Sequence, residues 1–395
     1  MEGPLYDQGL CGLKKLQELD LQGNSFEGTL PSCLYNLTSL QRCDNKKVEI
    51  ETENSDWVPL FQLESLVISN CSLNKLSHRL PTFLFHQHSL RSLGLEHTGL
   101  KGPFPDWLFR NNTRLKYAIL HDNSFSGHFH LPLFLNSTHG IDVSNNQLIG
   151  KLQRNIGEIL PNIRYLILSN NSFSGSLPSS IGNMSLLSVF DVSFNNFSGE
   201  VPKELPVENL VDFSLEFVNS FLDPDGINVY ELDVEVNFVT KYRLSSYKGG
   251  ILTYMSGLDL SCNNLIGEIP PELGQLQEIH ALNLSHNQLI GSIPKSFSNL
   301  TELESLDLSH NRLSREIPPQ LIELTFLAVF SVAYNNLSGR TPDMKAQFGT
   351  FQASSYDGNP FLCGVPLEKS CSNNKDASPP TPTQSSNWIV TSNSQ

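Results

Sequence analysis

The sequence predicts an α/β-type solenoid, a right-handed superhelix with a parallel β-sheet on its concave face and an irregular or 3-10 convex side. Three observations support this fold class. Equivalent apolar residues recur every 24 positions, as at Leu258, Leu282, Leu306 and Phe330. Apolar and polar residues alternate at the start of each period, which is typical of a half-buried strand. Asn, Gly and Pro follow at fixed offsets, and units of this length bury their apolar side only by stacking.

The repeating unit has the pattern LxxLxLxxNxLxGxIP. Residues 279–294 read IHALNLSHNQLIGSIP, and residues 303–318 read LESLDLSHNRLSREIP. We expect about twelve units. The places where the pattern holds or stops predict an uncapped N-terminal remnant (1–12), about eight repeats of which one is degenerate at 37–59 (13–202), an island (203–251), four repeats (252–342), a C-terminal cap (343–371) and a disordered polar tail (372–395).

The Asn and Gly positions that recur in each unit have structural roles. An Asn falls where the chain leaves the strand, where its amide can bond backbone groups that no ladder satisfies. The loop Gly permits a tight bend, and Arg315 replaces it in one unit, which we expect to weaken that bend. We expect an internal Asn column made of Asn24, Asn123, Asn146, Asn171, Asn195, Asn263, Asn287, Asn311 and Asn335.

Charge and cysteine content limit the partners and the disulfide bonds that the chain can have. The formal net charge of −14 argues against binding to nucleic acid or to an acidic membrane surface. Seven cysteines are too few for a disulfide-built fold, but Cys363 and Cys371 lie close together in a Gly/Pro-rich segment and predict a bridge. We expect Cys11, Cys33, Cys43, Cys71 and Cys262 to be small, buried apolar residues.

The sequence offers little catalytic or metal-binding chemistry. The glycines follow the repeat rather than cluster before a helix, so no phosphate loop is expected. Histidines such as His97 and His121 are scattered, without His-x-x-x-His or paired Cys-x-x-Cys spacing. Carboxylates such as Asp191, Asp259 and Asp307 share one repeat position, which indicates a regular polar column. We therefore expect no metal, no cofactor and no enzymatic activity.

The island interrupts the repeats for about fifty residues, and a loop that long in a compact array is usually functional. Apolar residues alternate with polar ones from Tyr230 to Phe238, which predicts a strand. A basic, aromatic-rich segment follows within 241–250 (KYRLSSYKGG). Two interpretations stay open: a solvated loop covering the flank of the solenoid, or a ligand-facing surface formed by Lys241, Tyr242, Arg243, Tyr247 and Lys248.

Taken together, these features resemble the plant leucine-rich repeat receptor-like proteins, which lack a kinase domain. The resemblance rests on the LxGxIP repeat, an island before the last four repeats, residues 254–270 (YMSGLDLSCNNLIGEIP) and the closing residues 356–371 (YDGNPFLCGVPLEKSC). It implies a plasma-membrane receptor ectodomain that binds peptide, microbial or other extracellular ligands through its island and concave face. Signalling in defence or development would run through co-receptor and adaptor receptor kinases.

By the same resemblance, the last four repeats would meet a co-receptor. Their outward strand residues form a polar surface with little net charge, which suits hydrogen-bonded contact with a protein. The expected contact residues are His280, Ser285, His286, Ser309, His310 and Tyr334. Sequons are abundant, and those on outer segments are the expected glycosylation sites: Asn36, Asn111, Asn136, Asn183 and Asn299.

Two alternatives remain. One is a secreted leucine-rich repeat inhibitor of a cell-wall-degrading enzyme, although an island is not expected in that class. The other is a non-functional truncated receptor, because the first ten residues show no secretory signal and no stretch reaches the roughly 18 apolar residues of a membrane span. On that expectation, membrane association would need a segment absent from this chain.

Overall fold

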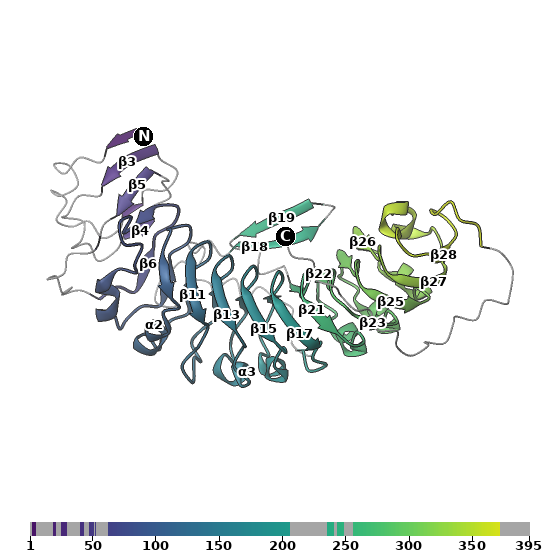
Figure 1. Ribbon diagram of the computed structural model, residues 1–395, viewed down its shortest axis with the longest axis horizontal. Helices are drawn as coiled ribbons and strands as arrows, with labels where there is room; N and C mark the ends of the chain where they lie inside the picture. Colours follow the sequence, from purple (N-terminus) through teal and green to yellow (C-terminus); the bar gives the residue numbers. More distant parts are fainter. Residues whose placement is uncertain are drawn as a thin grey trace, which may run out of the picture.

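In the computed structural model the chain forms an open arc built from stacked repeats (Figure 1). The structure describes residues 62–205 and 256–371 in full, together with Thr52 and the strand backbones at 2–4, 19–20, 25–29, 40–42, 47–50, 235–240 and 243–248. The expected remnant (apart from its strand at 2–4), the polar tail, Asn24, Asn36, Lys241 and Tyr242 lie outside the described residues. None of the described helices is long and apolar enough to cross a bilayer.

A parallel sheet of ten strands lines the inner face, with one short strand from each repeat. In spatial order it contains β6 (Ser65–Val67), β8 (Ser92–Gly94), β10 (Tyr117–Ile119), β12 (Gly140–Asp142), β14 (Tyr165–Ile167), β16 (Val189–Asp191), β20 (Gly257–Asp259), β22 (Ala281–Asn283), β24 (Ser305–Asp307) and β26 (Val329–Ser331). Leu282 pairs with Leu258 on one side and Leu306 on the other, so the 24-residue period sets the register. The parallel solenoid predicted from the sequence is confirmed.

The sheet continues unbroken across the island. Val189 of β16 pairs with Gly257 of β20, although 65 residues (192–256) lie between the two strands in the sequence. The backbone of the island forms an antiparallel hairpin of β18 (Glu235–Thr240) and β19 (Arg243–Lys248). Part of the strand predicted over 230–238 is therefore present, and residues 230–234 lie outside the description.

A second line of parallel strands follows the loop of each repeat. One sheet contains β9 (Lys101–Pro103), β11 (Ser124–His128), β13 (Gln147–Gly150), β15 (Ser172–Gly175), β17 (Asn196–Glu200) and β21 (Asn264–Ile266), and another contains β23 (Ile290–Gly291), β25 (Arg312–Arg315), β27 (Asn336–Arg340) and β28 (Phe361–Cys363). The loop glycines sit here at positive φ, as at Gly291 (φ 80°). Arg315 holds φ 70° in the same slot, which is the strained bend expected from the sequence.

The N-terminal strands continue both lines. They are β1 (Glu2–Pro4), β3 (Ser25–Thr29), β5 (Lys47–Ile50) and β7 (Ser72–Leu73) in one sheet, and β2 (Leu19–Asp20) and β4 (Leu40–Arg42) in another. The segment whose sequence loses the repeat pattern contains β5, which pairs with β3 and β7.

The outer side carries single turns of helix. Pro294 and Pro318 precede such turns with φ near −60°, because a proline fixes this angle and the Ile-Pro pair ends the extended segment. These elements are η2 (Thr82–His86), α2 (Asp106–Asn111), α3 (Ile156–Ile159), η3 (Ser179–Asn183), η7 (Pro271–Gln275), η8 (Lys295–Asn299) and η9 (Pro319–Glu323).

One continuous apolar core runs through the described repeats from Leu63 to Leu362. At its C-terminal end the cap contains η10 (Ala346–Gly349) and η11 (Ala353–Ser355). Phe348, Phe351 and Tyr356 are at most 1% exposed and pack on Phe330 of the last repeat, with ring centroids 5.0–5.8 Å apart. These aromatic rings close the solenoid, because a terminal repeat has no neighbour to cover it.

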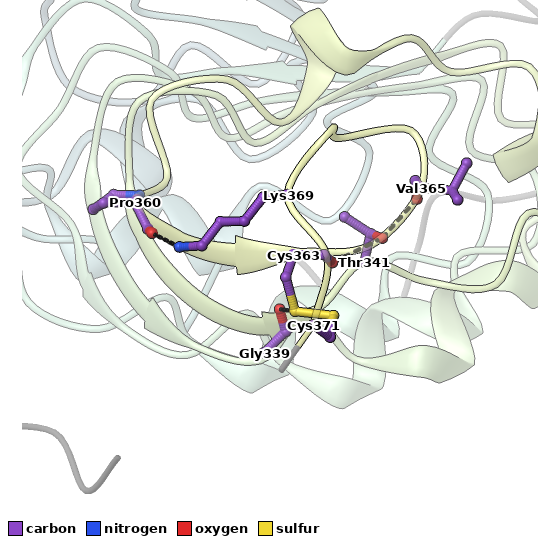
Figure 2. The surroundings of a disulfide bond; sticks show 7 residues. All are labelled: Gly339, Thr341, Pro360, Cys363, Val365, Lys369 and Cys371. Carbon is purple, nitrogen blue, oxygen red and sulfur yellow. Dashed lines mark hydrogen bonds between the residues drawn. A yellow bond between two sulfur atoms is a disulfide. The ribbon is translucent and has the colours of Figure 1, made fainter. Parts of the chain in front are cut away.

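A disulfide links Cys363 and Cys371 in the cap, with their Cα atoms 5.1 Å apart (Figure 2). In the same loop, the Thr341 hydroxyl donates to Val365 O at 2.6 Å and Lys369 Nζ donates to Pro360 O. The disulfide and the Lys369 bond close this loop on itself, and the Thr341 bond joins it to the residue that follows β27.

Two of the remaining cysteines differ from the sequence expectation. Cys71 is 2% exposed but disulfide-bonded, so its interpretation as an ordinary buried apolar residue is wrong. Cys262 is a free thiol that is only half-buried, because it occupies a loop position facing solvent. Cys11, Cys33 and Cys43 lie outside the described residues.

Candidate recognition surface

The Asn column holds the loops at the edge of the inner sheet in place. Asn287 is 8% exposed, and its Nδ2 donates to Leu260 O, Leu284 O and Ser285 O at 2.9–3.2 Å, while its Oδ1 accepts from Leu265 N at 3.0 Å. The same set of bonds recurs at Asn123, Asn146, Asn171, Asn195, Asn263, Asn311 and Asn335. Each side chain ties its own loop to the repeat before it.

The sequence interpretation missed one member of this column. Asn359 in the cap donates to Val332 O at 2.9 Å and accepts from Leu337 N at 3.0 Å. It stands 24 residues after Asn335, so the repeat spacing itself was the signal that would have identified it. The cap therefore begins as a further repeat before it closes the array.

Immediately before each described Asn of the column lies a residue with positive φ, and in most repeats its side chain is exposed. His286, His310 and Tyr334 hold this position in three consecutive repeats, with φ of 53–55°. Their rings stack, with centroids 4.1 Å apart between the two histidines and 4.4 Å apart between His310 and Tyr334. We call these three residues the aromatic column.

The aromatic column is exposed and has low charge. Tyr334 is 55% exposed, and both histidines are exposed as well. Partial burial and the neighbouring His286 lower the pKa of His310, so its imidazole is predominantly neutral near pH 7. The stacked rings offer a flat, preorganised surface, because each ring is restrained by the next one.

The other expected co-receptor residues do not all reach this surface. Ser285 and Ser309 are only 4% and 7% exposed, so they offer a partner little contact surface. Each lies one residue before the aromatic column, where the chain bends inward and the backbone N–H bonds the side chain two residues earlier, as from Ser309 N to Asp307 Oδ1 at 2.9 Å. His280 is half-buried, and its Nδ1 lies 3.2 Å from the Ser256 hydroxyl.

A line of polar residues runs beside the aromatic column on the inner sheet. Asp191 pairs with Asp259, Asp259 with Asn283, and Asn283 with Asp307. Burial and the neighbouring Asp191 raise the pKa of Asp259 to about 7, and Asn283 Nδ2 donates to its Oδ2 at 3.0 Å. This is a shared polar line along the sheet, as its single repeat position indicates, rather than a paired acid and base.

The island hairpin lies on the inner side of the arc (Figure 1). Cα atoms of β18 come within 8 Å of Cα atoms of β22. In the hairpin register Arg243 stands opposite Thr240, Tyr247 opposite Val236, and Lys248 opposite Glu235. The structure thus places three of the five expected island residues on a strand that reaches over the inner sheet.

The expected glycosylation sites that the structure describes lie on outer segments. Asn136, Asn183 and Asn299 are exposed, and Asn299 ends η8. Asn111 ends α2 and is half-buried, with its Nδ2 donating to Phe85 O at 3.3 Å. A glycan at any of the three exposed positions would leave the inner sheet uncovered.

Comparison with known proteins agrees with this architecture. Leucine-rich repeat family models match residues 253–313, 15–37 and 162–184. The Cuscuta receptor 1 of Solanum lycopersicum is 42% identical, with 93% of this chain and 59% of the relative covered. Receptor-like protein 1 of Arabidopsis thaliana is 34% identical over 45% of this chain and 21% of its own length. The chain thus spans less than two thirds of these relatives.

A solved structure shares the solenoid over most of the chain. The ectodomain of the Arabidopsis receptor kinase HAESA, in complex with an extended IDA peptide hormone, is 29% identical with a TM-score of 0.58. The match covers 94% of this chain and 62% of that one. Repeat pattern, inner sheet, Asn column and relatives all agree: the chain is a leucine-rich repeat protein whose relatives are plant receptor-like proteins.

Proposed function

We propose that this chain is the ligand-recognition part of a plant cell-surface receptor-like protein that signals through partner receptor kinases. The observation that carries the proposal is the aromatic column, an exposed stack of rings on the last repeats beside an island hairpin that reaches over the same sheet. Exposed aromatic residues are unusual on a surface that has no partner, and they are enriched at protein interfaces.

The physical argument concerns the entropy lost on binding. Side chains pay for being immobilised at an interface, and a ring already held by its neighbours has less freedom to lose. His310 is held between His286 and Tyr334 with interplanar angles of 12° and 17°. The stack thus provides a rigid anchor for a partner, and we assign the aromatic column together with half-buried His280 as the co-receptor contact.

The island hairpin is the proposed ligand-contacting element. Its β19 contains Arg243, Tyr247 and Lys248, two cations and an aromatic residue in an otherwise acidic chain. A peptide or another extracellular ligand with carboxylate or phenolic groups would suit this chemistry. The hairpin lies above β22, so a ligand held there would lie close to the repeats that carry the aromatic column.

A location on the outer side of the plasma membrane fits the disulfide and the glycosylation sequons of the chain. Disulfides such as Cys363–Cys371 persist in oxidising compartments, and exposed sequons at Asn136, Asn183 and Asn299 would be modified on a secretory route.

The test measures binding of the secreted chain to a panel of plant receptor-kinase ectodomains by surface plasmon resonance. We expect at least one to bind, and the double variant His286→Ala/His310→Ala to weaken that binding by more than about tenfold, as for a central aromatic anchor. The matched control is His128→Ala/His130→Ala, which removes two exposed histidines at and just after the end of β11 on the second line of strands.

Three outcomes would count against the proposal. Binding to no kinase ectodomain would remove the partner, equal binding by both double variants and the parent would remove the footprint, and equal loss in both would indicate an unspecific effect. A thermal unfolding curve for each variant separates lost contact from lost folding.

A further inference from the structure

A second cluster of chemistry-bearing residues lies at the other end of the inner sheet, on two neighbouring repeats. His97 follows β8, and His121 with Asp122 follows β10. His97 Nε2 lies 3.2 Å from Asp122 Oδ2, and His121 Nδ1 lies 2.6 Å from the same oxygen. One donor atom from each of the three residues falls within 4.8 Å of both others.

Motifs such as His-x-x-x-His do not reveal this grouping, because they place metal ligands about one helical turn apart in the sequence. A stacked array brings together residues one repeat apart instead. His97 and Asp122 occupy the same positive-φ position in successive repeats, with φ of 51° and 55°, and His97 N donates to His121 O at 3.3 Å. Neighbouring strands about 4.8 Å apart thus deliver their side chains to one place.

The buried imidazole provides an independent observation. The His121 side chain is 9% exposed, and its Nε2 is buried without a hydrogen-bond partner. That nitrogen lies 3.8 Å from Glu96 Oε2, and the Glu96 side chain is 5% exposed. Because Nδ1 faces Asp122 and Nε2 faces Glu96, the ring stands between a candidate ligand set and a buried carboxylate.

The surroundings favour a positive charge at this place. Asp122 Oδ2 lies 2.6 Å from His121 Nδ1, and Glu96 Oε2 lies 3.8 Å from its Nε2. Asp142, on the next strand of the inner sheet, is 1% exposed. Carboxylates gathered around one place stabilise a cation there.

We propose that His97 Nε2, His121 Nδ1 and the Asp122 carboxylate form a binding site for a divalent transition-metal ion, with Zn²⁺ as the ion whose ligand preferences fit. Two imidazoles and one carboxylate are a known ligand set for zinc with one position left open. Ligands about 2.0–2.2 Å from a tetrahedral ion lie about 3.3–3.6 Å apart, close to the present His97–Asp122 separation. Nitrogen donors disfavour Ca²⁺ and Mg²⁺.

Glu96 acts in this site as a positioning residue. A metal at Nδ1 requires His121 to be neutral with its remaining proton on Nε2, and that N–H would then donate to Glu96. Such a carboxylate–histidine–metal arrangement fixes the tautomer and the ring orientation. A metal ligand must be unprotonated at its donor atom, so the ion competes with protons and binds more weakly at acid pH.

The open position faces solvent. The His97 side chain is 50% exposed and that of Asp122 is 27% exposed, whereas His121 and Glu96 close the inner side. A bound ion would therefore accept a fourth ligand, water or a carboxylate of a partner molecule, from outside the solenoid.

The test uses the full chain with its disulfides intact, its free thiols alkylated, and Zn²⁺ as the probe in isothermal titration calorimetry. We expect binding of one ion with proton release. His97→Ala removes a ligand, so it should weaken binding by more than about tenfold, because the loss of a residue that only supports a ligand already has an effect of that size. Glu96→Gln removes such a supporting residue and should weaken binding by about 10- to 100-fold. The matched control is His128→Ala, which removes an exposed histidine at the end of β11, and its affinity should equal that of the parent chain.

A second readout separates a metal site from a merely structural charge cluster. Zn²⁺ should raise the melting temperature of the parent chain and of His128→Ala, and leave that of His97→Ala unchanged. Absence of binding to the parent, equal binding by all variants, or a loss of stability in His97→Ala that is the same with and without Zn²⁺ would overturn the proposal.

Discussion

Replacing Asn287 by Ala tests how the solenoid holds its repeats together. The side chain makes four hydrogen bonds with backbone groups of its own repeat and of the repeat before it, and it is 8% exposed. Alanine removes all four and leaves the Leu265 N–H without its partner in the interior, whereas Leu260 O keeps the bond from Asn263 Nδ2 at 3.2 Å. A net hydrogen bond contributes about 1 kcal/mol, and a stranded buried group costs about 1–3 kcal/mol. We therefore expect a loss of about 3 kcal/mol.

The control is Asn264→Ala, because Asn264 is exposed and bonds only the exposed side chain of Asn196 among its described contacts. A surface change of this kind should stay within about 0.5 kcal/mol. Both variants would be unfolded in guanidinium chloride and followed by far-ultraviolet circular dichroism. Hydrogen exchange of peptides from residues 258–294 would show where the loss falls.

The reasoning also predicts a local effect. Repeats contact only their neighbours, so exchange should rise at the Leu265 amide and in the two repeats that meet at Asn287, while the cap stays protected. A loss below about 1 kcal/mol, or an unchanged Leu265 amide, would refute the view that the Asn column joins adjacent repeats.

Three further changes test other parts of the structure. Phe348→Ala should cost about 3–5 kcal/mol, because it empties a fully buried ring site in the cap, and denaturant unfolding would measure this. Arg315→Gly should stabilise by about 1 kcal/mol, because glycine relieves φ 70°; an unchanged melting temperature would contradict it. In metal-free buffer, the pKa of His121 is raised from 6.5 to about 9, so its stabilisation is complete below pH 6.5 and is lost as pH rises through 9. The difference is about 3 kcal/mol, and His121→Gln should abolish that part of the pH dependence.

Much of the fold was predictable because the repeat places one chemical requirement at each slot. An Asn before the loop, a Gly within it and a Pro after it each satisfy a local backbone need, so the pattern predicts the inner sheet and the column of amides. Asn359 shows that the same spacing extends into the cap.

The recognition surface was less predictable. Alternation along a strand indicates which side of the sheet a side chain is on, but not how much of that side chain its neighbours cover. Ser285 and Ser309 are small and lie at an inward bend, so their neighbours cover them. His286 and His310 were assigned to the surface, but their stacking with Tyr334 depends on the distance between repeats.

The sequence by itself determined the rhythm of the chain: which residues enter the core, where each strand ends, and where the repeats stop for the island. These features follow from local periodicity and backbone chemistry. Only the tertiary structure decided which side chains of different repeats meet, as His97 meets Asp122 and His121, because those meetings depend on the register and separation of stacked strands. It also decided that β16 joins β20 and that the hairpin reaches over β22, since strands far apart in the sequence pair only when the repeats are stacked.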